Sequence, residues 1–279
     1  MTDLITKTKK YFPGKPKYVT KINIKYKRKM DELLLNKIYK FIKQSFKNSS
    51  LSVLNHVIVG LSGGLDSTMV ALLCKNALGK NRVTAVIIDL GLKEHREQTR
   101  FAVNIAKKLD INYVVVKAPN LFKTYKNAIR ENGPFTEINI TTRSIHNLIF
   151  QYADAKMAVV VSTVDKSEYI TGRHMEYFYG HFAPMFGLYK TEIYDLAKYL
   201  KIPKEVINRE PGCFDAWFDK DIFGVSYDIL DPIIYLIYEK GLTAKDISKK
   251  YKIDEEWLKK IEFRIKNHKY RMQTEEFKI

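Results

Sequence analysis

The stretch that most constrains the fold of this chain is an apolar run that breaks into a glycine-rich turn, Val57-Ile58-Val59-Gly60-Leu61-Ser62-Gly63-Gly64-Leu65-Asp66-Ser67. Its beta-branched start suits a buried strand, and its paired glycines permit a tight turn whose amides can face an anion. A helix over Met69–Leu78 would follow, and its positive N-terminal end would add to the attraction. The stretch therefore predicts a phosphate-binding turn between a strand and a helix, with the hydroxyls of Ser62 and Ser67 as further donors.

Asp66 is the most informative residue of this turn. The common nucleotide loop G-x-x-x-x-G-K-[ST] is absent, so no lysine grips phosphates from the turn itself. A carboxylate beside a phosphate is repulsive unless a divalent cation lies between them, so the turn indicates pyrophosphate together with Mg²⁺. The plainer alternative is an ordinary strand-turn-helix corner, in which Asp66 and Ser67 serve only as an early-helix acid and a cap.

Strand-like and helix-like segments alternate along the first two thirds of the chain. We expect helices at 33–46, 69–78, 94–109, 124–130, 140–154 and 190–200, and strands at 57–59, 83–89, 113–116 and 158–162. This alternation implies crossover connections and an α/β fold, a parallel sheet with helices on both faces. The ligand crevice of such a sheet lies beyond the carboxyl ends of its strands, where the turn after Val59 and the stretch Ser162–Glu168 would both emerge.

The pattern changes after the stretch Ser162–Glu168. Residues 173–188 are rich in aromatics and glycine, which suggests a loop that contacts substrate or an interface. Three C-terminal helices are expected at 227–239, 243–251 and 254–267, and the last two could form a helix-turn-helix DNA reader. We favour packing against the α/β body, because Glu255, Glu256 and Glu262 would face a phosphate backbone badly.

The 279 residues suffice for one α/β domain with appendages. We expect a basic irregular arm at 1–30, a single domain at 31–272 and a short tail at 273–279. The net charge is +17, and residues 1–50 carry 14 Lys and Arg against 3 Asp and Glu. Such an arm could dock on nucleic acid, but a solubilising extension is the favoured interpretation.

Two exclusions follow from apolar content and cysteine count. No apolar stretch approaches the roughly 20 residues of a membrane helix, and the N-terminus lacks the apolar segment of a secretory signal, so a cytoplasmic protein without a membrane partner is expected. Two cysteines, Cys74 and Cys213, exclude a disulfide framework and a Cys-x-x-Cys motif. Cys74 fits a helix core, whereas the role of Cys213 stays open.

The turn Ser62–Ser67 resembles the pyrophosphate loop of the N-type ATP pyrophosphatases. Four further segments, in chain order, resemble the ammonia-dependent NAD synthetase family within that superfamily: Ser162-Thr163-Val164-Asp165-Lys166-Ser167-Glu168, Gly187-Leu188-Tyr189-Lys190-Thr191-Glu192-Ile193-Tyr194, Phe223-Gly224-Val225-Ser226-Tyr227-Asp228-Ile229-Leu230-Asp231 and Asn267-His268-Lys269. The likeness implies an adenine nucleotide alpha-hydrolase-like, Rossmann-like fold.

The resemblance also implies roles for single residues. Ser62, Asp66 and Lys190 would be catalytic, and Asp66 and Glu168 would hold Mg²⁺. The residues that would bind ATP or pyrophosphate are Gly60, Leu61, Ser62, Gly63, Gly64, Leu65, Asp66, Ser67, Thr163 and Lys190. Arg143, which matches the arginine of an Asn-x-x-Ala-Arg segment, would bind the second substrate together with His268 and Lys269.

Membership of this family would imply a two-step reaction. A carboxylate of nicotinic acid adenine dinucleotide (deamido-NAD) attacks the α-phosphate of ATP, and ammonia then displaces AMP to give the amide. Charge grows on the departing pyrophosphate, so backbone amides and a fixed cation would help most in the transition state. A homodimer is expected, with ammonia either free or supplied by a separate glutaminase subunit.

Three departures from the family pattern concern the substrates. Residues 173–182 are shorter than the family's corresponding loop and lack its lysine and aspartate, which contact the deamido dinucleotide. Ile145 replaces a second arginine, and Gly212 stands where the family has a Ser or Thr that touches ATP. The adenylating half is thus well kept and the acceptor half is altered.

Two alternatives follow from these departures. One is a related enzyme that adenylates another carboxylate or a tRNA base. The other is a nucleotide-binding regulatory protein that has lost turnover. The retained Asp66, Glu168 and Lys190 argue against the second, because binding alone does not require a metal at the scissile bond.

Overall fold

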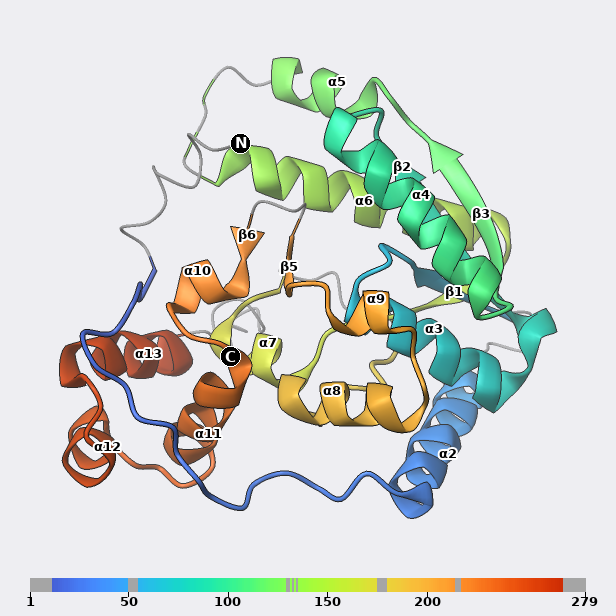
Figure 1. Cartoon of the computed structure of the whole chain (residues 1–279). Coiled ribbons are helices and arrows are strands. Elements are labelled where there is room, and N and C mark those ends of the chain that lie inside the picture. Colours follow the sequence, from blue (N-terminus) through green and yellow to red (C-terminus); the bar gives the residue numbers. More distant parts are fainter. Residues whose placement is uncertain are drawn as a thin grey trace, which may run out of the picture.

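A computed structural model describes residues 12–49, 55–128, 131, 133, 135–174, 180–213 and 217–267. Its centre is a four-stranded sheet of β1 (His56–Gly60), β2 (Val83–Asp89), β3 (Asn112–Lys117) and β4 (Ala158–Val161) (Figure 1). The strand order is β3-β2-β1-β4 and every pairing is parallel. The parallel α/β fold predicted from the sequence is confirmed.

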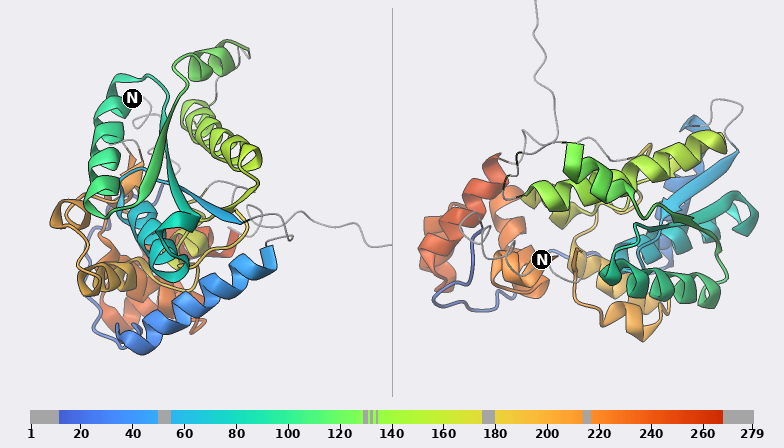
Figure 2. Two further views of the ribbon diagram at one scale, coloured as in Figure 1. Left: turned by 90° about the vertical axis from the view of Figure 1, so that its right-hand side faces the viewer. Right: turned by 90° about the horizontal axis from the view of Figure 1, so that it is seen from above.

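The two faces of the sheet are covered by different helices. Side chains of Val57 and Val59 point into the larger core, which they share with α2 (Glu32–Ser49), α3 (Leu65–Leu78) and α4 (Lys93–Lys108). Ile58 points the other way and packs with α6 (Thr136–Ala155). This alternation is the period of two of a strand buried on both faces, and Figure 2 shows α4 and α6 on opposite sides of the sheet.

A second core joins the C-terminal helices. α10 (Asp219–Phe223), α11 (Tyr227–Tyr238), α12 (Ala244–Tyr251) and α13 (Glu255–Asn267) surround the buried Trp257, whose indole N–H donates to the carbonyl of Phe223 at 2.9 Å. Ile247 of α12 and Leu258 of α13 are fully buried in this core. The apolar faces of these two helices are therefore used in packing, as favoured over a DNA reader.

Short elements escaped prediction from the sequence. α7 (Lys166–Thr171), α9 (Lys204–Ile207), α10 and a hairpin of β5 (Gly212–Cys213) and β6 (Trp217–Phe218) were not expected. Helix α8 (Lys190–Tyr199) was expected. Helix α5 (Leu121–Ala128) was also expected, but it begins three residues before the predicted start. One or two turns hold too few residues for an apolar period to show.

Residues 12–30 run without helix or strand along the C-terminal helices. Ile22 is buried at 4% exposure in the second core, so this part of the arm packs on the body of the protein instead of being only a solubilising extension. Among the described helices, none has the length and apolar character needed to cross a bilayer.

Candidate active site

The glycine turn leaves β1 at the carboxyl edge of the sheet, as predicted. Gly63 has φ +79°, and a Cβ there would lie 2.7 Å from the ring of Phe101, so both the torsion and the space require glycine. The hydroxyls of Ser62 and Ser67 lie 3.1 Å apart, and the Ser67 hydroxyl donates to the carbonyl of Gly64. In this structure the two serines hold the turn in shape.

Lys190, the first residue of α8, projects into a group of three carboxylates beyond the turn. Its Nζ lies 2.7 Å from Oδ2 of Asp66, 2.6 Å from Oδ2 of Asp165 and 3.4 Å from Oε1 of Glu168. Lys190 and Asp165 are completely buried, whereas Asp66 and Glu168 keep 25% and 20% of their side chains exposed. The structure thus brings together the three residues that the resemblance implied and adds Asp165.

The electrostatics of this group are dominated by burial. Burial raises the pKa of Asp165 to about 6, and raises that of Glu168 well above its usual range, in both cases against the pull of Lys190. Burial alone would lower the pKa of Lys190, but the carboxylates of Asp165, Asp66 and Glu168 raise it well above its ordinary value. Lys190 is therefore a fixed positive charge at neutral pH.

Asp165 also begins a helix. Its Oδ1 accepts from the amide of Glu168 at 2.8 Å, and Oε2 of Glu168 accepts from the amide of Asp165, which makes a capping box at the start of α7. The cap orients Glu168 toward Lys190. Sequence reasoning missed Asp165 as a site residue, although a carboxylate three residues before Glu168 in a matched motif was a usable signal.

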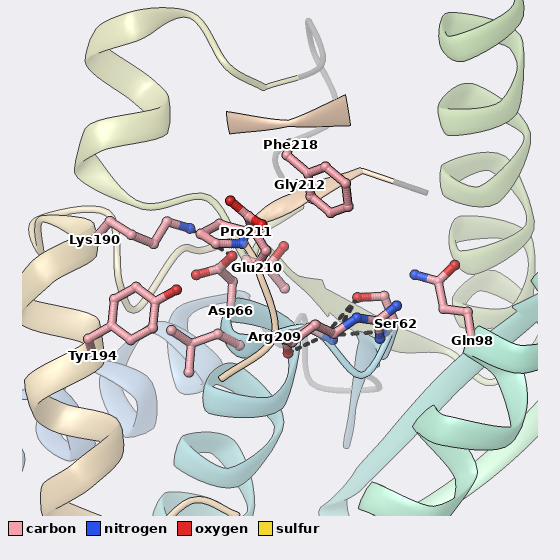
Figure 3. A pocket seen from close by; sticks show the side chains of 14 residues that line it. Ser62, Asp66, Gln98, Lys190, Tyr194, Arg209, Glu210, Pro211, Gly212 and Phe218 are labelled. Carbon is pink, nitrogen blue, oxygen red and sulfur yellow. Dashed lines mark hydrogen bonds and ion pairs between the residues drawn. The ribbon is translucent and has the colours of Figure 1, made fainter. Parts of the chain in front are cut away.

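Two cavities meet at the turn. The polar cavity contains Asp66, Lys190 and Arg209, and Figure 3 shows Lys190 and Tyr194 reaching it from α8 on one side with Gln98 from α4 opposite. The apolar cavity, about 270 Å³, lies between the sheet and α6. The residues that line both are Ser62, Ser67, Gln98, Thr163 and Gly212. A charged group and an apolar ring of one ligand could thus be bound side by side.

The fold and this site can be compared with known proteins. The sequence model of NAD synthase matches residues 34–275. The chain belongs to the NAD synthase family. An NH3-dependent NAD(+) synthetase of Archaeoglobus fulgidus is 33% identical over 219 residues, 77% of this chain and 87% of the relative. The NH3-dependent NAD(+) synthetase of Methanocaldococcus jannaschii is 31% identical over 250 residues, which are 86% of this chain and 94% of that relative.

Solved structures agree with this NAD synthase assignment. The NH3-dependent NAD synthetase of Campylobacter jejuni superposes with a TM-score of 0.72 at 25% identity, over 89% of this chain and 100% of that chain. The NMN synthetase of Francisella tularensis shares the fold, with a TM-score of 0.70 at 19% identity. The superposition covers 88% of this chain and 98% of that chain.

Some of the other site residues predicted from the sequence line the two cavities, and others do not. Gly60 lies against α6, where a Cβ would meet Ile149 at 2.6 Å, and it lines the apolar cavity with Leu61. Gly64, Leu65 and Ser67 line the polar cavity. Arg143 is exposed on α6 and is not among the described residues that line either cavity. His268 and Lys269 lie outside the described residues.

The departures from the NAD synthase pattern fall at the cavities. Ile145 lines the apolar cavity, and Gly212 of β5 lines both. Residues 175–179, the middle of the altered loop, lie outside the described part of the chain, but Arg173 before them donates to Asp219 at 2.9 Å. Arg209 was not predicted; no motif of the family resemblance contains it.

Proposed function

We propose that this protein is a ligase that amidates nicotinic acid adenine dinucleotide with ammonia to give NAD, at the expense of ATP, with AMP and pyrophosphate as products. The observation that carries the proposal is the position of Lys190 and Asp66 at the mouth of the glycine turn, 2.7 Å apart at Nζ and Oδ2. A fixed cation there can meet the charge that develops on departing pyrophosphate. The ATP-using family to which the chain belongs supports this reading.

In this proposal the turn, Lys190 and Arg209 bind the phosphates of ATP. Arg209 lines the polar cavity with Asp66 and Lys190, so it supplies a second cation. The apolar cavity next to it, walled by Val86, Ile145 and Phe150, suits a nucleobase. Thr163 lies where the two cavities meet, in position to contact the sugar or the α-phosphate.

Asp66, Asp165 and Glu168 fit a Mg²⁺ ion. One oxygen from each lies within 4.8 Å of the others, and hard carboxylate oxygens are the ligands that Mg²⁺ uses. Oδ1 of Asp66 is buried, and within the described residues it has no hydrogen-bond partner. When bound, the ion would neutralise the phosphates and stabilise the leaving group. Lys190 contacts the same three carboxylates, so its ammonium would lie beside the ion and the phosphates.

The acceptor half is the altered part of the proposal. Arg143 on α6, with His268 and Lys269, would bind the dinucleotide, and the substrate of a homodimer would lie near the subunit interface. The reading as an enzyme for another carboxylate or a tRNA base is not favoured by the comparisons. We also propose a cytoplasmic location, with ammonia free or delivered by a separate glutaminase.

One assay tests the function. The pure protein is incubated with ATP, Mg²⁺, ammonium and the deamido dinucleotide, and AMP, pyrophosphate and NAD are followed together. Equal amounts of the three products are expected. If pyrophosphate is released with some other acceptor and no NAD forms, the assignment of the acceptor is overturned. The proposal that the site adenylates an acceptor with ATP would still hold.

A further inference from the structure

Residues 12–30 form a strap that binds the C-terminal half of the protein before the chain enters α2. The amide of Lys17 donates to Oδ2 of Asp254 at 2.8 Å, and Ile22 is buried among the C-terminal helices. The match to the family model begins at residue 34, after this segment. Figure 1 shows the strap running alongside the C-terminal helices and then below α8 to α2.

The far end of the strap holds the first turn of α8. The hydroxyls of Tyr26 and Thr191 lie 3.0 Å apart. The amide of Arg28 donates to Oε1 of Glu192 at 2.7 Å, and its guanidinium Nη1 donates to Oε2 of Glu192 at 2.8 Å. The same Nη1 donates to the carbonyl of Gly187 at 2.9 Å. Arg28 therefore joins both sides of the point where α8 begins.

The contact with Arg28 is important because Glu192 is a buried residue that caps α8. Its side chain is fully buried, and Oε2 also accepts from the amide of Tyr189 at 2.9 Å, which caps the helix. A buried carboxylate without a cation is strongly unfavourable, so the ion pair with Arg28 stabilises Glu192 at this position. The strap thus stabilises the capping residue of the helix that carries Lys190.

Two further amides of the turn are also used by the protein. The amide of Lys190 donates to the hydroxyl of Ser167 at 2.9 Å, and that of Thr191 donates to Oδ2 of Asp231 at 2.8 Å. These two amides are not available to an anion, whereas the ammonium of Lys190 can meet one. The position of its Nζ depends on how firmly the turn is held.

We propose that Arg28, with Tyr26, is a positioning residue for Lys190: the strap fixes the first turn of α8 and thereby the ammonium at the carboxylates. The kinetic consequence rests on the proposed function, because it requires Lys190 to act on ATP. The placement of Lys190 does not depend on that function and can be measured separately.

The kinetic test compares Arg28→Ala with Lys27→Ala. Lys27 pairs with Asp195 on the exposed side of the same helix, so it is a matched control. Arg28→Ala should lower kcat/KM for ATP about ten-fold, equivalent to about 1.4 kcal/mol, while KM for ammonium stays unchanged and Lys27→Ala behaves as wild type. An unchanged kcat/KM for ATP in Arg28→Ala would overturn the proposal.

A double variant separates positioning from stability. In Arg28→Ala/Glu192→Gln the buried charge is gone and the Gln oxygen can still cap Tyr189, so the free energy of unfolding should recover relative to Arg28→Ala. The guanidinium contacts of Arg28 with Gly187 and with residue 192 are still missing, so kcat/KM for ATP should stay low. If the kinetics recover together with the stability, Arg28 acts only through stability and the positioning role is refuted.

Lysine acylation followed by mass spectrometry gives a readout that needs no turnover. Lys190 is 1% exposed, so it should label slowly in the wild type and in Lys27→Ala, and faster in Arg28→Ala. Equal labelling of Lys190 in all three proteins would refute the proposal. If Lys190 labels faster in Arg28→Ala but the wild type makes no NAD, the proposed function is wrong. The positioning of Lys190 by the strap is then still supported.

Discussion

Lys190 and Asp165 form a buried ion pair, with Nζ 2.6 Å from Oδ2 and neither side chain more than 1% exposed. Oδ1 of the same carboxylate caps α7. One residue therefore serves both the local structure and the charge of the site, and the two roles can be separated by substitution.

Asp165→Asn should keep the cap and lose the charge, because Asn is as good an N-cap residue as Asp. With one anionic oxygen fewer, the Mg²⁺ concentration at half-maximal pyrophosphate release should rise about ten-fold. The control is Asp195→Asn, which changes a half-buried carboxylate of α8 that pairs with Lys27. A Mg²⁺ titration identical to wild type would remove Asp165 from the metal site.

Lys190→Met should abolish pyrophosphate release and destabilise the protein by about 3–5 kcal/mol, since it leaves the carboxylates without their cation. Carboxylates with a raised pKa hold protons in the folded state, so the deficit should shrink as the pH falls from about 7 to about 5. Urea unfolding at both pH values measures this. Full activity in the variant would contradict the role given to Lys190.

Gly63→Ala should reduce both stability and activity. A left-handed torsion costs a non-glycine residue about 1–2 kcal/mol, and the new methyl group would press on Phe101, which must move. Gly241→Ala is the matched control, since Gly241 has φ +66° with open space around it. If both variants lose the same stability and both keep their activity, the contact with Phe101 does not shape the turn.

Asp231 should make stability depend on pH. Burial raises its pKa to about 7, against the hydrogen bonds from Ser167 and Thr191, so the folded state favours the protonated form. The contribution is present below the ordinary pKa of an aspartate and is lost as the pH rises through about 7, with a slope of up to about 1.4 kcal/mol per pH unit. Asp231→Asn should remove this slope in unfolding curves measured from pH 4 to pH 7. Parallel curves for the two proteins would contradict the shift.

Local sequence determined the sheet and its turn. The beta-branched run of β1 suits a strand buried on both faces, and the glycine at position 63 permits the positive φ that the turn adopts. These features can be read in one short stretch of sequence, so the strand, the turn and the following helix were predictable. The matched motifs around Glu168 and Lys190 added the family chemistry.

Tertiary structure alone decided which charges meet. Arg28 and Glu192 are 164 positions apart, and a run of lysines and arginine in an irregular arm gives no sign of which one will reach a buried carboxylate. Asp165 likewise could be read as a helix cap, but its second oxygen faces Lys190 only because α7 and α8 pack side by side. Long-range burial makes these pairs strong, and burial is a property of the folded chain rather than of its sequence.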